Sequence, residues 1–204
     1  MYKKIILTLL GIVLIYGAVA FALKAGIGVL PVDAAITTLS TIIGIRVGTF
    51  SMLFHGSFFV GQIVIEKKNF KKIELLQIPY IALGGSILNF FFYTILKNVS
   101  FHLYPIRLIV CILSFVTAAF GCILILETHL MKTPMEGFIQ LVADKIGTTM
   151  GKLRQKIDIA LVILCIVLTL IFHTEWTIRE GTIIATLVFG PSMDLIKKYI
   201  FNKS

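Results

Sequence analysis

Six long apolar runs constrain this chain more than any other feature of its sequence. Each run holds roughly 15 to 24 residues and very few charges. An α-helix rises 1.5 Å per residue, so about 20 apolar residues cross the roughly 30 Å hydrocarbon core of a bilayer. We therefore expect an all-α integral membrane protein with six transmembrane helices. The expected spans are Ile5–Leu23, Val47–Ile65, Ile73–Leu96, Leu108–Leu126, Ile157–Phe172 and Thr182–Ile196.

The composition argues against a soluble fold. Apolar residues make up 58% of the chain and charged residues only 14%, whereas soluble domains carry roughly 25% charged residues. Most of the charges lie in short segments between the runs, which leaves no room for a second domain. We expect a single membrane domain over residues 1–204, with the lipid bilayer as its main partner. The first run follows Lys3 and Lys4, and we interpret it as a span, not as a signal peptide.

An internal repeat relates the two halves of the chain at an offset of 103 residues. The matched positions are mostly proline, glycine or ionisable residues, which apolar composition alone would not align. Further along, after two inserted residues, Gly85 and Asn89 fall on Gly190 and Asp194. The repeats cover residues 1–97 and 104–200. The first matched set is Pro31, Asp33, Ile36, Ile43, Gly44 and Gly48, which falls on Pro134, Glu136, Ile139, Ile146, Gly147 and Gly151.

Each half also holds one short helix that begins at a proline. These helices, Val32–Ile43 and Met135–Ile146, have about 12 residues and reach only about 18 Å, which is too short to cross a bilayer. Proline suits a helix start because its missing N–H would have no partner there, and glycine suits a helix end. We expect each short helix either to re-enter the membrane from one side or to lie at its surface.

Basic residues predict how the chain is oriented. Three spans in each half, with the N-terminus inside, place 14 Lys and Arg residues on the cytoplasmic side and 5 on the outer side. This imbalance is the one that the positive-inside rule favours. An odd number of spans per repeat inverts the second half relative to the first. We therefore predict two inverted three-helix repeats in the cytoplasmic membrane, with both termini in the cytoplasm. The five outer residues are Lys24, Arg46, Lys97, Arg107 and Arg179.

Ionisable groups near membrane depth are costly and mark candidate sites. Arg154 and Asp158 lie four residues apart, so they share one helical face within reach of an ion pair. One interpretation is a polar vestibule in which Arg154 meets an anionic substrate group or pairs with Asp158, while a carboxylate or a histidine exchanges a proton. The other is structural: an ion pair fixes the span, and Asp33 and Glu136 serve the helix dipole. The candidate substrate-binding residues are Arg154, Asp158, Asp194, Glu136, Asp33, His55 and Asn89.

The sequence has no motif for metal binding or for catalysis. No group of His, Cys, Asp and Glu has the spacing of metal ligands, and no phosphate loop or nucleophile motif is present. We therefore expect no metal, no cofactor and no enzymatic activity. The formal charge of +9 is explained by membrane orientation, so nucleic acid is not expected as a partner. Three cysteines within apolar runs are interpreted as packing residues.

The chain resembles the YczE/YyaS/YitT-like family of small bacterial multi-pass membrane proteins over nearly its whole length. In place of the Asp that commonly follows the second proline, this sequence has Glu136, and residues 127–132 replace a glycine-rich approach to that proline. The resemblance implies a protein of the bacterial cytoplasmic membrane, with some members linked to secondary-metabolite production. The residues that carry it are Gly26, Gly28, Pro31, Asp33, Gly44 and Gly48 in the first half, and Pro134, Gly147, Gly151, Arg154, Asp158, Gly181, Thr182, Gly190 and Pro191 in the second.

Three functions fit these features. The leading hypothesis is a small-solute transporter or exporter that works as a homodimer, because paired short helices within inverted repeats recur in secondary transporters. The second is a membrane accessory protein that supports a biosynthetic complex without transporting anything. The third is a substrate-capture subunit of a multi-part importer. Fold alone does not distinguish them.

Overall fold

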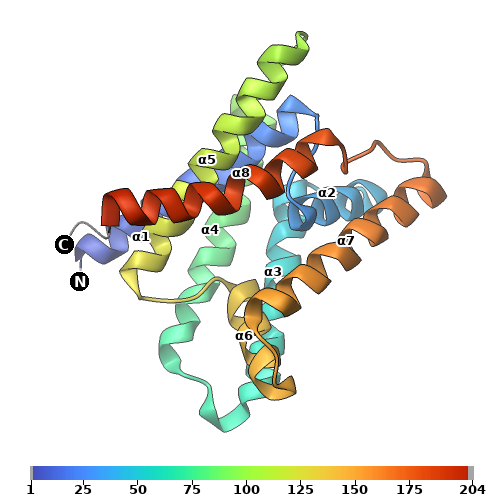
Figure 1. The fold of residues 1–204 in the computed structure, drawn as a ribbon. Coiled ribbons are helices and arrows are strands. Elements are labelled where there is room, and N and C mark those ends of the chain that lie inside the picture. The colour runs from blue at the N-terminus through green and yellow to red at the C-terminus, as the bar shows by residue number, and fades with distance from the viewer. Residues whose placement is uncertain (1, 202–204) are drawn as a thin grey trace.

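The computed structural model describes residues 2–201, and every regular element in that range is a helix (Figure 1). Five helical segments are long and apolar enough to cross a membrane, and they correspond to the first five expected spans. The five segments are α1 (Tyr2–Ala25), α3 (Val47–Glu66) with its continuation to Asn69, Lys72–Ile95 including α4 (Gln77–Phe90), α5 (Tyr104–Thr128) and α7 (Met150–Phe172).

The sixth expected run lies in α8 (Glu180–Ile196). This helix has 17 residues and carries Pro191 in its interior. It is shorter than the five long helices, and a single π-helical turn, Lys197–Phe201, follows it. The structure therefore supports a multi-pass membrane protein with five spanning helices, and the sixth crossing remains a prediction.

The two short helices form where the sequence places them. They are α2 (Pro31–Ile43) and α6 (Pro134–Ile146), each with 13 residues. Each begins at its proline, and each ends at a glycine in the left-handed conformation, with φ of 78° at Gly44 and 67° at Gly147. In α6 the Thr133 hydroxyl also accepts a hydrogen bond from the Glu136 N–H. The local signals for start and stop are therefore confirmed.

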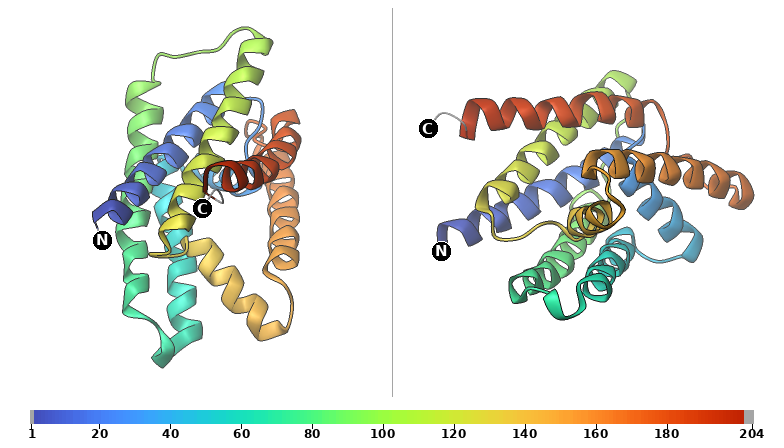
Figure 2. Two further views of the ribbon diagram at one scale, coloured as in Figure 1. Left: turned by 60° about the vertical axis from the view of Figure 1, so that its left-hand side comes forward. Right: turned by 60° about the horizontal axis from the view of Figure 1, so that its bottom comes forward.

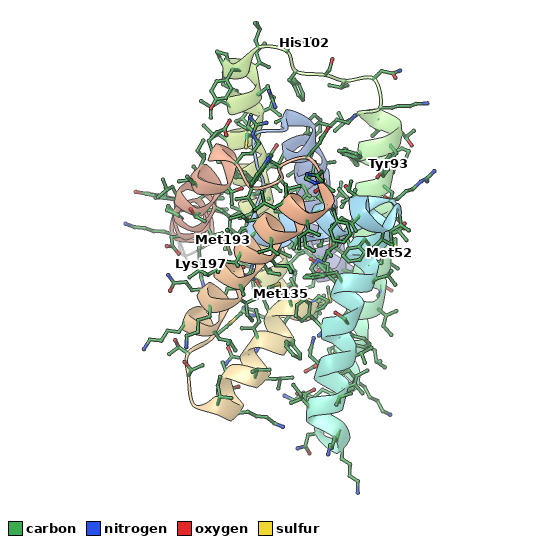
Figure 3. All side chains as sticks on the ribbon, turned by 90° about the vertical axis from the view of Figure 1, so that its right-hand side faces the viewer. Met52, Tyr93, His102, Met135, Met193 and Lys197 are labelled. Atoms are coloured by element: carbon green, nitrogen blue, oxygen red, sulfur yellow. The ribbon has the colours of Figure 1, made fainter. Side chains whose placement is uncertain are left out.

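The N-terminal ends of both short helices lie inside the protein. In α2, Pro31 and Val32 are buried whereas Ile43 at the other end is 57% exposed. In α6, Met135 is 3% exposed and Ile146 is 62% exposed. Figure 3 shows Met135 in the middle of the molecule. Both helices thus run from the interior to the surface, which favours re-entry over a helix lying flat on the membrane.

Helices from the two halves pack against each other. The long helices α1 and α5 cross closely, because Gly11 and Gly121 let their backbones approach: a Cβ added at either glycine would meet the carbonyl oxygen of the other at 2.7 to 2.8 Å. Each short helix packs on a long helix of the opposite half, α2 on α7 and α6 on α3. The halves are therefore interlocked and do not form separate bundles.

The last pair of helices differs between the halves. In the first half α3 packs closely on α4, with Gly48 against Gly85. In the second half α7 and α8 diverge from the loop that joins them and form an open V (Figure 2). The corresponding glycines, Gly151 and Gly190, have no atom within 4 Å of an added Cβ. At these two glycines, therefore, α8 does not pack on α7.

Candidate functional site

The predicted ion pair of α7 is present. The Arg154 Nε donates to both carboxylate oxygens of Asp158 at 3.1 Å, and about a third of each side chain is exposed. One turn of helix separates the two residues, so the pair follows from local geometry. Arg154 also lies within electrostatic reach of two groups from the first half of the chain, Asp33 and His55. This places four of the seven candidate residues in one region.

Asp33 occupies the first turn of α2, a helix too short to span the membrane. Burial raises the pKa of its carboxyl group to about 7, and the positive charge of Arg154 opposes this rise only in part. No Lys, Arg or His nitrogen among the described residues lies within 4.0 Å of the Asp33 carboxylate, since Arg154 is held by Asp158. Asp33 is therefore able to bind and release a proton near neutral pH.

Two buried tyrosines lie beside the starts of the short helices. Tyr16 of α1 and Tyr80 of α4 are 5% and 4% exposed, and their ring centroids are 6.0 Å apart. Asp33 is within electrostatic reach of Tyr16, and Glu136 of α6 is within reach of Tyr80. The His55 Nδ1 is buried without a hydrogen-bond partner in the described chain. We call Asp33, Glu136, His55, Arg154 and Asp158 the central group.

The remaining two candidates lie outside this group. Asn89 is a packing residue of α4: its side-chain oxygen accepts from the Gly48 N–H at 2.9 Å, and its amide donates to the Thr49 hydroxyl at 3.1 Å. Asp194 is exposed on α8, within the arm that diverges from α7. The structure thus brings five of the seven sequence-predicted residues together.

A pocket of about 1230 Å³ opens at one end of the bundle. It lies between the end of α1, the polar face of α2, the end of α4 and the loop from α7 to α8, residues 173–179. Figure 3 shows Tyr93, one of its wall residues, which lies in the turn Phe91–Ile95 that continues α4. None of the seven candidate residues lines it. Its polar and aromatic lining includes Thr37, Thr38, Ser40, Thr41, Phe92, Tyr93, Arg107, His173, Glu175, Trp176 and Arg179.

Two arginines of this pocket meet at the end of α1. The Arg107 Nε donates to the Ala25 carbonyl and its Nη2 to the Gly26 carbonyl, both at 2.5 Å. Arg179 donates to the same Gly26 carbonyl at 2.9 Å. The last carbonyls of a helix have no partner within it and attract cations. The two arginines therefore tie α5 and the start of α8 to the end of α1.

The sequence did not predict these two arginines as site residues, nor a second polar pair, Gln62 and Gln77. Gln62 and Gln77 are each 1% exposed and exchange two amide hydrogen bonds, of 2.9 and 3.1 Å, while Gln62 also donates to the Pro134 carbonyl at 2.7 Å. This pair holds the start of α6 against α3 and α4. A glutamine within an apolar run was the available signal, because buried amides need partners.

No metal site is evident among the described residues. Within that part of the chain no three His, Cys, Asp or Glu side chains gather as ligands would. Cys111 and Cys165 are buried, Cys122 is partly buried, and all three are free thiols. The polar groups of the interior are therefore carboxylates, one histidine, guanidinium groups, hydroxyls and the amides of Gln62 and Gln77.

These features define a multi-pass helical membrane protein with a polar interior and a pocket at one end. Residues 2–198 match the model of a family of unknown function, DUF6198, and the chain belongs to that family. No curated protein and no solved structure matches the chain. The finer resemblance to the YczE/YyaS/YitT-like proteins remains a prediction.

Proposed function

We propose that this protein transports a small polar solute across the cytoplasmic membrane, through the pocket and the central group. The observation that carries the proposal is a continuous polar face on α2. Asp33, Thr37 and Thr41 are spaced four residues apart, so they lie on one side of the helix. Thr37 and Thr41 line the pocket, and Asp33 lies one turn deeper, within reach of Arg154. A solute in the pocket would thus be one helical turn from a group that titrates near neutral pH.

The second short helix repeats this pattern. Glu136, Gln140 and Asp144 on α6 have the same spacing, and the Gln140 amide donates to Asp144 at 2.7 Å. Both helices also direct their N-terminal ends, which carry partial positive charge, into the interior. Paired short helices that approach a site from opposite sides are the binding architecture of several classes of secondary transporter. The two polar faces would form the outer and inner halves of one path.

We further infer the inverted three-plus-three repeat. Its support is the reciprocal packing of α2 on α7 and α6 on α3, together with the matched ends of the two short helices. Six crossings require α8 and its π-helical turn to complete the last span. The positive-inside rule then places Lys67, Lys68, Lys71 and Lys72 in the cytoplasm and the pocket on the outer face.

Flux into proteoliposomes tests the transport proposal. Purified protein would be reconstituted, exposed to a defined mixture of small metabolites, and the vesicle contents measured by mass spectrometry. We expect at least one polar solute to enter several-fold faster than into empty vesicles. Thr37→Val and Asp33→Asn should slow this flux at least tenfold, because one alters the pocket wall and the other removes the titrating group.

The matched control is Thr186→Val. It makes the same chemical change at an exposed position of α8, where the hydroxyl only donates to the Ile183 carbonyl. Its flux should equal that of the unmodified protein. A solute that binds the protein saturably but never crosses would overturn transport and favour an accessory role.

A further inference from the structure

Arg107 is a cation without a carboxylate partner on the wall of the pocket. Arg107 is partly buried, and no carboxylate oxygen of residues 2–201 lies within 4.0 Å of its guanidinium. Guanidinium groups removed from water are normally paired with an anion. We propose that the pocket binds the carboxylate or phosphate group of a small organic anion through Arg107 and Arg179. This names the substrate class of the proposed transport site and rests on that function.

Hydrogen-bond counting shows that both arginines keep donors for a ligand. A guanidinium has five N–H groups. Arg107 uses two of them, on the carbonyls of Ala25 and Gly26, and Arg179 uses one, on Gly26. Three N–H groups therefore remain on Arg107. On Arg179 the Nε faces the Glu180 carboxylate at 3.5 Å, so three N–H groups remain there as well. Because both groups donate to the Gly26 carbonyl, they lie side by side, and their remaining N–H groups are placed to donate to one anion.

The charge around the pocket is positive. Lys24 and Arg46 stand at its rim, where Lys24 lies 4.9 Å from the ring centroid of Phe92 and Arg46 lies 5.6 Å from that of Tyr93. With Arg107 and Arg179 these make four cations. Two carboxylates oppose them: Glu175 lines the pocket, and Glu180 lies 3.5 Å from Arg179. An anion entering the pocket would be attracted by the excess of two positive charges.

The rest of the wall fits an organic body better than a bare inorganic ion. Phe92, Tyr93 and Trp176 line the same space, and Trp176 is 51% exposed. The pocket volume of about 1230 Å³ also greatly exceeds that of an inorganic ion. Aromatic faces supply apolar contact beside the guanidinium groups. A small carboxylate or phosphate ester with an apolar or aromatic part would contact the arginines through its anionic group and the aromatic side chains through its apolar part.

The position of Trp176 makes the proposal directly measurable. It is the single tryptophan of the chain, and it lies in the pocket. Full-length protein in an uncharged detergent would be titrated with benzoate, phenyl phosphate and benzylamine while tryptophan emission is followed. We expect a saturable change with the two anions and none with benzylamine, which has a similar ring but a positive charge.

Variants assign the change to the arginines. Arg179→Gln should weaken binding of both anions at least tenfold, and Arg107→Lys should weaken it while keeping the charge, because lysine lacks the planar fork of donors. Lys68→Gln removes one exposed charge at the opposite end of the bundle and should leave the titration unchanged. Thermal melting of each variant confirms that it is folded. Equal responses to benzoate and benzylamine, or an unchanged Arg179→Gln titration, would overturn the proposal.

A lipid headgroup carries the same phosphate chemistry, so the titration is repeated in nanodiscs. Saturable benzoate binding in pure phosphatidylcholine discs identifies a soluble anion as the ligand. A Trp176 response only when phosphatidylglycerol is added would overturn the soluble anion and assign the arginines to a lipid. These measurements are made at equilibrium without flux. Anion binding without transport would therefore refute the proposed function alone, and transport without anion binding would refute this inference alone.

Discussion

Asp33 shows how one residue connects the fold to the proposed chemistry. It sits in the first turn of α2, where the helix dipole favours its charged form, yet burial outweighs that effect and raises the pKa of its carboxyl group to about 7. Arg154 forms its ion pair with Asp158, at 3.1 Å, and not with Asp33. A change of protonation at Asp33 would therefore alter the competition between two carboxylates for one guanidinium.

The stability of the protein should fall as pH rises between about 4 and 7, in part because of Asp33. The folded state holds the Asp33 proton more tightly than the unfolded state, so stability is greatest at low pH and is lost as the group ionises. The rise of the Asp33 pKa to about 7 corresponds to a loss of at most about 4 kcal/mol of stability. Melting temperatures in detergent at pH 5 and pH 8 would measure this loss.

The Asp33→Asn variant isolates this contribution. Other groups also titrate over this range, so the comparison with the unmodified protein is made at each pH. We expect the variant to be relatively more stable at pH 8 than at pH 5. Parallel pH profiles for the two proteins would show that Asp33 keeps an ordinary pKa.

At the scale of elements, small residues decide which helices approach. Gly48 and Gly151 are both second residues of their helices, α3 and α7, and they correspond in the repeat. A Cβ at Gly48 would collide with the carbonyl oxygen of Gly85 and with Asn89, whereas a Cβ at Gly151 meets nothing within 4 Å. Of these two corresponding glycines, Gly48 thus has a packing role and Gly151 has none.

Alanine substitutions should separate the two glycines. Gly48→Ala forces α3 and α4 apart and should cost about 1 to 3 kcal/mol. Gly151→Ala should change stability by less than about 1 kcal/mol, and in the stabilising direction, because alanine loses less backbone entropy in a helix. Thermal or denaturant unfolding in detergent measures both. Equal costs at the two positions would mean that α8 packs on α7.

At the scale of the whole molecule, the proposed repeat predicts a closed form of the second half. In an inverted-repeat transporter the two halves exchange arrangements, so α8 would pack on α7 as α4 packs on α3. Gly151, Gly190 and Asp194 would then take the places of Gly48, Gly85 and Asn89. The open V between α7 and α8 would be one of two states.

Cross-linking in membranes tests this closure. Cysteines at Gly151 and Gly190, in a chain whose three native cysteines are changed to alanine, should form a disulfide if the Cα atoms approach to roughly 4.4 to 6.8 Å. Cysteines at Gly56 and Gly190 lie on helices from different halves and serve as the pair that should stay reduced. Absence of the first cross-link under oxidising conditions would argue that α8 never closes.

Orientation in the membrane has its own test. If the pocket faces outward, a cysteine at Arg46 on its rim should react with a membrane-impermeant maleimide in intact cells. A cysteine at Lys68, at the opposite end of the bundle, should react only after the cells are opened. Both positions are exposed, so access to the reagent decides the result. The reverse pattern would invert the proposed topology.

The sequence alone determined the features that depend on near neighbours. Run length predicts the five long helices, proline and glycine define both ends of α2 and α6, and the spacing of Arg154 and Asp158 predicts their ion pair. Each signal acts within a few residues, over one or two turns of helix. These local signals did not decide whether the sixth run spans the membrane, because α8 is short and contains Pro191.

The tertiary structure decided what is assembled from distant parts of the chain. Arg107 and Arg179 meet at Gly26 across 81 and 153 residues of sequence. Gln62 reaches Pro134 across 72. No periodic pattern marks such contacts, because they depend on which helix faces pack and how closely small residues let them approach. For this reason the ionisable residues near membrane depth could be selected from the sequence. The pocket and its two arginines became visible only in the folded protein.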